Sequence, residues 1–398
     1  MQNTIHPMKE KKWLLVLLLG ALTAMVPLTI DMYLPAFPAI QSELDASTSL
    51  VQLSLTASLL GIAIGQLVIG SLSDVYGRKK PLMISVTLFI IASFLCAFAP
   101  NIWFLVIFRF LQGLTGAGGI VIGRSIVRDL YEGYELTKMY ALLILVMGLA
   151  PILAPVIGGG LLALTSWRGI FVVLSVLGIL LLIMTIYKIK ETLDENQRSQ
   201  AGLKNSLMVF RGLLKHKRYI GFALAQGFTA AALFSYISGS SFVLQGIFDL
   251  SPQIYGLVFG LNAMGFIGMS QVTGRLAGKV PEEKILKVGF LVALIGGSSL
   301  VVASMIEASL LFVIFGLFLV TSSTGLINPT SLSLAMQTQD RNAGSASALL
   351  GLFQFVFGGI AAPLVGVAGT TTLLPLALII LTCQALSALA FVIFARSE

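Results

Sequence analysis

Two ionisable residues, Asp31 and Arg109, lie deep inside long apolar stretches of the sequence, 13–40 and 101–127. A charge at the centre of a bilayer is costly unless it faces a cavity, finds a partner or, for a carboxylate, takes up a proton. An aspartate that gains and loses a proton there can couple proton movement to transport. A guanidinium nearby lowers the proton affinity of such a carboxylate, whereas removal from water raises it.

Asp31 and Arg109 sit at similar distances from the ends of their apolar stretches, which places them at similar depth. Three arrangements fit this placement. The two residues titrate together during transport, they form a static pair that fixes helix packing, or Arg109 bonds only to backbone carbonyl groups and never meets Asp31. Buried pairs contribute little stability, and ions inside a membrane usually mark pathways. We therefore predict that both residues serve proton coupling.

The composition is that of a membrane protein with many spans. Of the 398 residues, 57% are hydrophobic and 11% are charged, whereas soluble domains carry about 25% charged residues. We predict an all-α polytopic protein of about twelve transmembrane helices, since about 20 apolar residues cross the hydrocarbon core. The apolar segments lie at 13–40, 50–73, 81–99, 101–127, 138–164, 168–189, 219–246, 252–275, 284–304, 308–330, 342–366 and 370–395.

Lysine and arginine predict the orientation of these spans. In the alternating arrangement, only Arg109 and Arg168 of the 25 Lys and Arg residues fall away from the N-terminal side. Because such residues gather on the cytoplasmic side of membrane proteins, we expect both termini in the cytoplasm. The net charge of +8 is then orientation charge, part of it in contact with anionic membrane lipid. We expect no nucleic-acid partner.

A long polar stretch divides the spans six and six. The predicted parts are a cytoplasmic N-terminus (1–12), an N-terminal six-helix half (13–190), a cytoplasmic linker (191–218) and a C-terminal six-helix half (219–396). The halves also echo each other, since 70–74 and 274–278 close the second and eighth segments about 204 residues apart. Two parallel six-helix halves, with a site between them, are the arrangement of many secondary transporters.

Two glycine-containing motifs indicate moving parts. The first places a carboxylate and an arginine around a tight turn, which suits a cytoplasmic latch that holds one state of a transport cycle. It comprises Gly70, Asp74, Gly77 and Arg78. The second combines prolines and glycines in the fifth segment, which predicts a kinked helix against which a neighbour packs closely. It comprises Pro151, Pro155, Gly158 and Gly159.

Polar and aromatic side chains within the spans are candidates for substrate contact. The C-terminal half has no ion well inside its spans, so we expect a roomy, mostly apolar cavity. Each polar residue taken alone could equally form a hydrogen bond between helices. The expected substrate-binding residues are Asp31, Tyr33, Gln112, Met147, Tyr236, Asn262 and Gln354.

The sequence does not favour an enzyme. The two histidines, His6 and His216, lie in hydrophilic ends, no carboxylate pair lies within one span, and no zinc-type spacing occurs. We therefore expect no catalytic residue, no metal and no cofactor, with protons as the coupling ion. Cys96 and Cys383 both lie in apolar segments, so no disulfide framework is expected.

The motifs resemble those of the major facilitator superfamily, specifically its twelve-helix drug/proton antiporters. Within that group, five segments resemble the Bcr/CflA branch, the bicyclomycin- and chloramphenicol-resistance type: 31–38, 109–113, 124–129, 146–155 and 167–168. The resemblance implies a monomer in the bacterial cytoplasmic (inner) membrane that exports small drugs in exchange for protons by alternating access.

The resemblance also implies residue roles. Asp31 would be the protonation and substrate-binding site, Arg109 the coupling arginine, and Asp74 and Arg78 part of the latch. The proline and glycine residues of the fifth segment would form the antiporter motif, Pro155 with Gly158 and Gly159. Two departures matter: Ala154 replaces the glycine that usually precedes Pro155, and Thr23 stands where some relatives carry a second acidic residue.

A proton-coupled transporter of one metabolite, such as a sugar, a peptide or an amino-acid-like compound, is the alternative. A dedicated sugar site would need several hydrogen-bonding residues at the membrane midplane. The polar residues of these spans are sparse and interleaved with aromatic ones, so the multidrug interpretation is preferred.

Overall fold

The structure, a computed structural model, describes residues 12–198, 210–338, 343–367 and 372–395. Nearly all of the expected N-terminal segment 1–12 and part of the linker 191–218 lie outside these residues. Within them the chain is helical, and twelve segments are long and apolar enough to cross a membrane. This confirms the predicted all-α polytopic fold.

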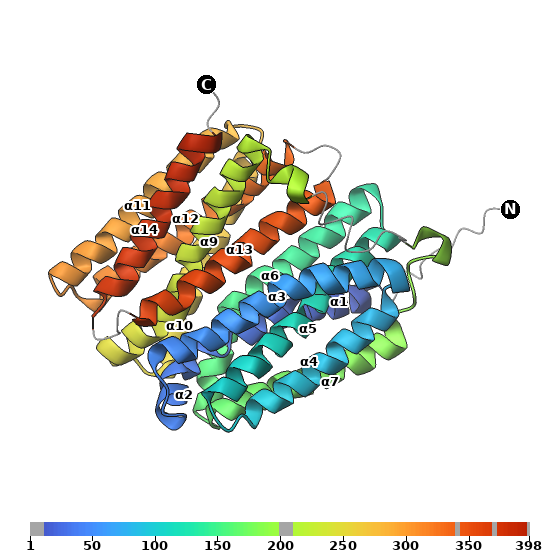
Figure 1. Ribbon diagram of the computed structural model, residues 1–398, viewed down its shortest axis with the longest axis horizontal. Coiled ribbons are helices and arrows are strands. Elements are labelled where there is room, and N and C mark those ends of the chain that lie inside the picture. Colours follow the sequence, from blue (N-terminus) through green and yellow to red (C-terminus); the bar gives the residue numbers. More distant parts are fainter. Residues whose placement is uncertain (1–11, 199–209, 339–342, 368–371, 396–398) are drawn as a thin grey trace.

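Each half contributes six of these segments (Figure 1). The N-terminal half consists of α1 (Lys12–Asp31), η2 (Leu34–Ala36), α2 (Phe37–Glu43), α3 (Thr48–Tyr76), α4 (Lys79–Ala97), α5 (Ile102–Leu130), α6 (Gly133–Leu162) and α7 (Trp167–Lys188), followed by η3 (Glu195–Gln197). The C-terminal half consists of α9 (Lys217–Phe242), η4 (Val243–Ile247), α10 (Pro252–Leu276), α11 (Glu282–Met305), α12 (Leu310–Met336), α13 (Ala343–Val367), α14 (Leu374–Ala390) and η5 (Phe391–Ala395).

The first membrane segment is not one continuous helix. It crosses as a single span, Leu15–Glu43, but α1 ends at Asp31 and the chain continues through the short helices η2 and α2. Pro35 lies at the start of η2, and Pro38 at the start of α2. Proline has no backbone N–H to donate, so these residues favour new helix starts over an unbroken helix. The break places Asp31 at a helix end.

Matching loop structures support the internal repeat. Asp45 and Asp249, 204 residues apart, both adopt positive φ angles, of 45° and 52°. Two residues after each aspartate, Ser47 and Ser251 accept a hydrogen bond from a backbone N–H in the first turn of α3 and of α10. A serine in this position satisfies one of the donors left free at a helix start. The two halves therefore begin their second spans in the same way.

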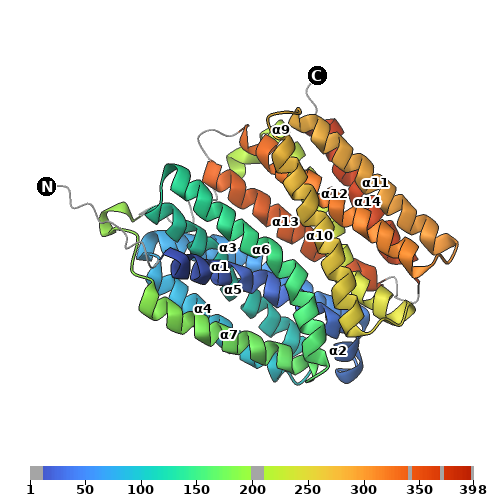
Figure 2. The same ribbon diagram turned by 180° about the vertical axis from the view of Figure 1, so that it is seen from behind.

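The halves meet mainly through two helix pairs, α3 with α13 and α6 with α10 (Figure 2). We call the end of the molecule that carries the α3–α4 loop, the start of α9 and both described chain ends the basic face, and the other end the opposite face. Five hydrogen bonds join the halves toward the opposite face: Gln52–Ser238, Thr56–Gly359, Ser241–Leu34, Gln245–Pro35 and Gln253–Gly159. The halves are therefore closed against each other there.

Candidate functional site

Asp31 lies where the two halves meet. It is only 4% exposed. Just beyond it, the carbonyl groups of Leu34 and Pro35 accept hydrogen bonds from Ser241 (2.8 Å) and Gln245 (3.3 Å) of the C-terminal half. In the part of the chain that the structure describes, the Asp31 carboxylate itself makes no hydrogen bond and no ion pair. A buried carboxylate without a partner is costly when charged, which makes it a candidate for proton uptake.

The C-terminal half faces Asp31 with two buried tyrosines. Tyr236 and Tyr255 both interact electrostatically with Asp31. The Tyr236 hydroxyl accepts a hydrogen bond from Asn262 Nδ2 (3.0 Å), and the Tyr255 hydroxyl lies 3.2 Å from Ser240 Oγ. Both rings pack on Phe259, at centroid distances of 5.3 and 6.0 Å. The groups of the C-terminal half that interact with Asp31 are thus neutral hydroxyls, held in place by an amide and a serine.

Arg109 does not contact Asp31 in this structure. Its Nη1 donates to the Thr29 carbonyl (3.1 Å) and to Gln112 Oε1 (2.6 Å), and its guanidinium carbon lies 4.6 Å from the centre of the Tyr33 ring. Its Nε and Nη2 have no hydrogen-bond partner among the described residues. Arg109 therefore holds the backbone two residues before Asp31 rather than the carboxylate itself.

The expected substrate-binding residues fall into separate places. Tyr33 and Gln112 are fully buried beside Arg109, with hydrogen bonds to Ser54 (2.7 Å) and Ser93 (2.8 Å). Tyr236 and Asn262 lie together in the C-terminal half, on the side of Asp31. The other two are partly buried, Met147 on α6 and Gln354 on α13. The structure thus joins Tyr236 to Asn262 by a hydrogen bond, and Tyr236 interacts electrostatically with Asp31.

The fifth-span motif forms two backbone contacts. A side chain at Gly158 would collide with the carbonyl of Met32, next to Asp31, and one at Gly159 would lie 2.5 Å from the carbonyl of Pro252 in the other half. The same helix carries Pro151 and Pro155. This confirms the expected close packing, and it explains why glycine is needed at both positions.

The α3–α4 loop forms an ionic cluster around Arg78. The buried guanidinium donates through Nε to Asp129 (2.8 Å) and through Nη1 to Asp74 (2.5 Å) and Ser73 (3.0 Å). Burial acts to lower the pKa of Arg78, but the bonds to the two aspartates outweigh it and raise this pKa. Gly70 packs against α5 at the start of the motif. In this structure the predicted latch residues bind within their own half.

Glu191, just after α7, completes this cluster. Its carboxylate accepts hydrogen bonds from the backbone N–H groups of four residues, at 2.7 to 3.1 Å: Arg78, Lys79, Thr192 and Leu193. Burial opposes ionisation of Glu191, but these four donors outweigh it and lower its pKa. Gly77 has a φ of 86°, and a side chain there would collide with the carboxylate.

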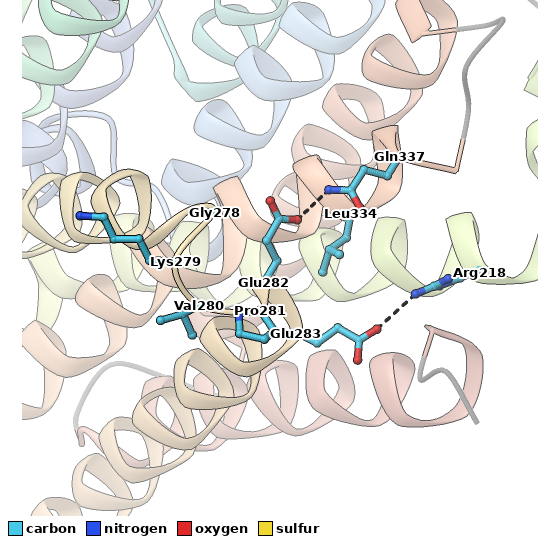
Figure 3. Close-up of a pocket in the computed structure, with 9 residues that line it drawn as sticks. All are labelled: Arg218, Gly278, Lys279, Val280, Pro281, Glu282, Glu283, Leu334 and Gln337. Carbon is cyan, nitrogen blue, oxygen red and sulfur yellow. Dashed lines mark hydrogen bonds and ion pairs between the residues drawn. The ribbon is translucent and has the colours of Figure 1, made fainter.

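The equivalent loop of the C-terminal half is built differently (Figure 3). Gly278, with a φ of 77°, stands 204 residues after Asp74, so the aspartate has no counterpart. Glu282 accepts hydrogen bonds from Gln337 (2.9 Å) and Ser333 (3.0 Å), and Arg218 donates to Glu283 (3.1 Å). All of these residues of the C-terminal half except Ser333 line a cavity of about 670 Å³ at the basic face.

Three residues of these clusters were not predicted from the sequence to have a role: Asp129, Glu191 and Tyr255. Asp129 lies in a segment that matches the Bcr/CflA pattern, which was the available signal for it. Glu191 and Tyr255 carry no local signal, because their partners are far away in the sequence. Among the described residues, no group of three or more His, Cys, Asp and Glu side chains could hold a metal ion.

Comparison with known proteins gives the family. Residues 19–363 match the family model described as Major Facilitator Superfamily. The chain is 41% identical over 388 residues to an uncharacterised MFS-type transporter, YdgK, of Bacillus subtilis, covering 97% of this chain and 96% of that protein. It is 28% identical over 383 residues to a bicyclomycin resistance protein homolog of Haemophilus influenzae, covering 96% of each.

Solved structures agree on the fold. The chain matches a bacterial homolog of the human lysosomal transporter Spinster, crystallised in an inward-facing, unoccupied conformation, with a TM-score of 0.79. The two are 15% identical, and the match covers 98% of this chain and all of that one. Together with the twelve apolar helices, these matches make the protein a multi-pass transporter of the bacterial inner membrane. The chain belongs to the major facilitator superfamily.

Proposed function

We propose that this protein exports small drug molecules in exchange for protons, with Asp31 as the residue that carries the proton. The observation that supports this most directly is the buried Asp31 carboxylate, unpaired in the described structure and located where the two halves meet. In a membrane interior such a group is stable when protonated, and it can be charged only when water or a partner reaches it. Movement of the halves changes both conditions.

In this proposal the basic face is cytoplasmic, as the distribution of Lys and Arg predicts. Opening toward the outside exposes Asp31 to protons there, and opening toward the cytoplasm releases the proton and admits the drug. Arg109 bonds to the Thr29 carbonyl, two residues before Asp31. In this proposal it holds the α1 backbone beside Asp31 while the carboxylate gains and loses its proton.

The proposed substrates are small and mostly apolar. Aromatic side chains at the contact between the halves, among them Phe259 on Tyr236 and Phe242 on Phe37, offer broad apolar contact rather than a set of directional hydrogen bonds. The name of the Haemophilus relative, a bicyclomycin resistance protein homolog, points to the same class of compound. Bicyclomycin and chloramphenicol are therefore the first compounds to test.

The test uses purified protein in liposomes, with a proton gradient of either sign imposed across the membrane. We expect gradient-driven accumulation of chloramphenicol or bicyclomycin in wild-type vesicles and none with Asp31→Asn. A substitution of the exposed Glu195, Glu195→Gln, removes a carboxylate of the linker and should transport normally. Flux of neither drug with correctly folded wild-type protein would overturn the proposal and favour a single metabolite as substrate.

A further inference from the structure

We propose that Tyr236, held in place by Asn262, is the group of the C-terminal half that hydrogen-bonds the charged form of Asp31, so that ionisation of Asp31 draws the two halves together. This inference rests on the proposed role of Asp31 as the proton carrier. Tyr236 would then be a positioning residue supplied by the C-terminal half. Its bond to Asp31 would link the charge on Asp31 to the relative position of the two halves.

The Tyr236 hydroxyl has a proton available for this bond. A phenol can donate one hydrogen bond and accept others. In the described structure the hydroxyl accepts from Asn262 Nδ2 at 3.0 Å and donates to no other group. Tyr236 is 1% exposed, so its hydroxyl lies inside the protein. Tyr255 and Asp31 both interact with it electrostatically, and Asp31 is the carboxylate of the two.

The position of Tyr236 is fixed by α10. Its ring stacks on Phe259, with centroids 5.3 Å apart and an interplanar angle of 17°. Tyr255, Phe259 and Asn262 follow one another at helical spacing, so they share one face of α10. Tyr255 closes the arrangement through its hydroxyl contact with Ser240, one turn beyond Tyr236 on α9. A ring packed in this way loses little freedom on forming a further bond.

The chain just after Asp31 is hydrogen-bonded to the same part of α9. Ser241, just after Ser240, donates to the carbonyl of Leu34, three residues beyond Asp31. On the other side, Gly158 of α6 brings that helix into contact with the backbone of Met32. The broken end of α1 is thus held between α6 of its own half and α9 of the other. A change in the charge of Asp31 therefore acts directly on the contact between the halves.

The ionisable groups of the N-terminal half near this part of α1 interact with one another. Arg109 of α5 interacts with Tyr33 and with Cys96 of α4, on the N-terminal side. On α9 and α10, the ionisable groups that interact with Asp31 in the described part of the chain are Tyr236 and Tyr255. A phenol binds a carboxylate about twice as strongly as it binds a neutral acid. The bond to Tyr236 therefore forms when Asp31 is charged and weakens when Asp31 is protonated.

Infrared titration of the purified protein tests this inference without any drug. A buried protonated carboxyl group gives a C=O stretching band that disappears as it ionises, and subtraction of the Asp31→Asn spectrum assigns that band. Tyr236→Phe removes the hydroxyl and should move the midpoint of the Asp31 band up by about one pH unit, because the charged form loses a donor. Asn262→Ala should move it in the same direction by less.

Matched substitutions separate this effect from general damage. Tyr219→Phe removes another buried hydroxyl of the same half, one that donates to the carbonyl of Ala346, and should leave the midpoint unchanged. An unchanged midpoint in Tyr236→Phe would overturn the inference, as would a shift confined to Tyr255→Phe. If no titrating band is lost in Asp31→Asn, the proposed proton carrier itself is wrong, a result distinct from failure of the Tyr236 bond alone.

Discussion

In the N-terminal half, two ionisable residues, Asp31 and Arg109, are buried at the centre of the molecule. On the side of Asp31, the C-terminal half carries neutral hydroxyl and amide groups, those of Tyr236, Tyr255 and Asn262. The basic face also differs: a buried arginine joins two aspartates in one half, and a half-exposed Arg218–Glu283 pair occupies the equivalent loop of the other. We infer that one half carries the coupling charges and that the other supplies neutral partners whose contacts change as the halves move.

Replacement of Arg109 should have the largest effect on transport in this comparison. Arg109→Gln removes a buried positive charge and its bond to the Thr29 carbonyl, which holds the backbone before Asp31, and we expect coupled transport to fall about tenfold or more. Arg109→Lys keeps the charge without the planar fork and should be intermediate. Proton-driven drug uptake into vesicles measures both. Arg168→Gln, at the opposite face, is the control, and equal activity of Arg109→Gln and the control would contradict the assigned role.

The asymmetry of the two basic-face loops predicts a difference in stability. Arg78→Gln leaves Asp129 without its buried partner and should lower the free energy of unfolding by about 2–3 kcal/mol. Arg218→Gln removes a half-exposed pair with Glu283 and should cost less than about 1 kcal/mol. Chemical unfolding followed by circular dichroism gives both values. Equal losses would mean that the two loops are alike energetically.

The contact of α6 with α1 predicts a graded response to added volume. Gly158→Ala places a methyl group against the Met32 carbonyl and should destabilise the protein by about 1–3 kcal/mol while slowing transport. Gly160→Ala adds the same methyl group where nothing lies within 4 Å and should be neutral. Thermal unfolding and vesicle uptake measure the two effects. A neutral Gly158→Ala would show that the helices separate at this point without cost.

Glu191 should contribute the smallest effect, with a defined pH dependence. Its pKa is lower in the folded than in the unfolded protein, so its stabilisation is present above the ordinary pKa near 4.5 and is lost as the pH falls through the lowered value. Glu191→Gln should cost about 1 kcal/mol at pH 7, as for loss of a helix cap, and nothing at the acid end. Unfolding curves between pH 7 and pH 3 test this, with Glu195→Gln as the control. A constant difference across that range would exclude an ionic contribution from Glu191.

The sequence was most informative where a residue contradicts its surroundings. A charge inside an apolar run is visible without any structure, which is why Asp31 and Arg109 were identified, and a cluster of prolines and glycines in one span marked the close contact at Gly158. The break of α1 after Asp31 was not predicted. The nearby prolines show where backbone donors are missing, but the packing of α6 and α9 determines where the helix ends.

Residues whose role depends on a distant partner could not be found in this way. Tyr255 is one aromatic among many until α9 brings Ser240 to it and α1 brings Asp31. Glu191 belongs to an acidic, polar stretch typical of solvated linkers, and only the turn at Gly77 turns two backbone N–H groups toward its carboxylate. The separation of Arg109 from Asp31 is likewise a property of helix packing, since their depths in the sequence allow a direct pair.

Drug-induced proton release is the most direct test of the central claim that Asp31 carries the exchanged proton. Purified protein in a weakly buffered detergent solution receives a drug that wild-type vesicles transport, and a pH indicator records the protons released. We predict release from the wild type and none from Asp31→Asn. Calorimetry under the same conditions reports whether the drug still binds the variant. Equal proton release from the wild type and Asp31→Asn would contradict the account and place the exchanged proton on another residue.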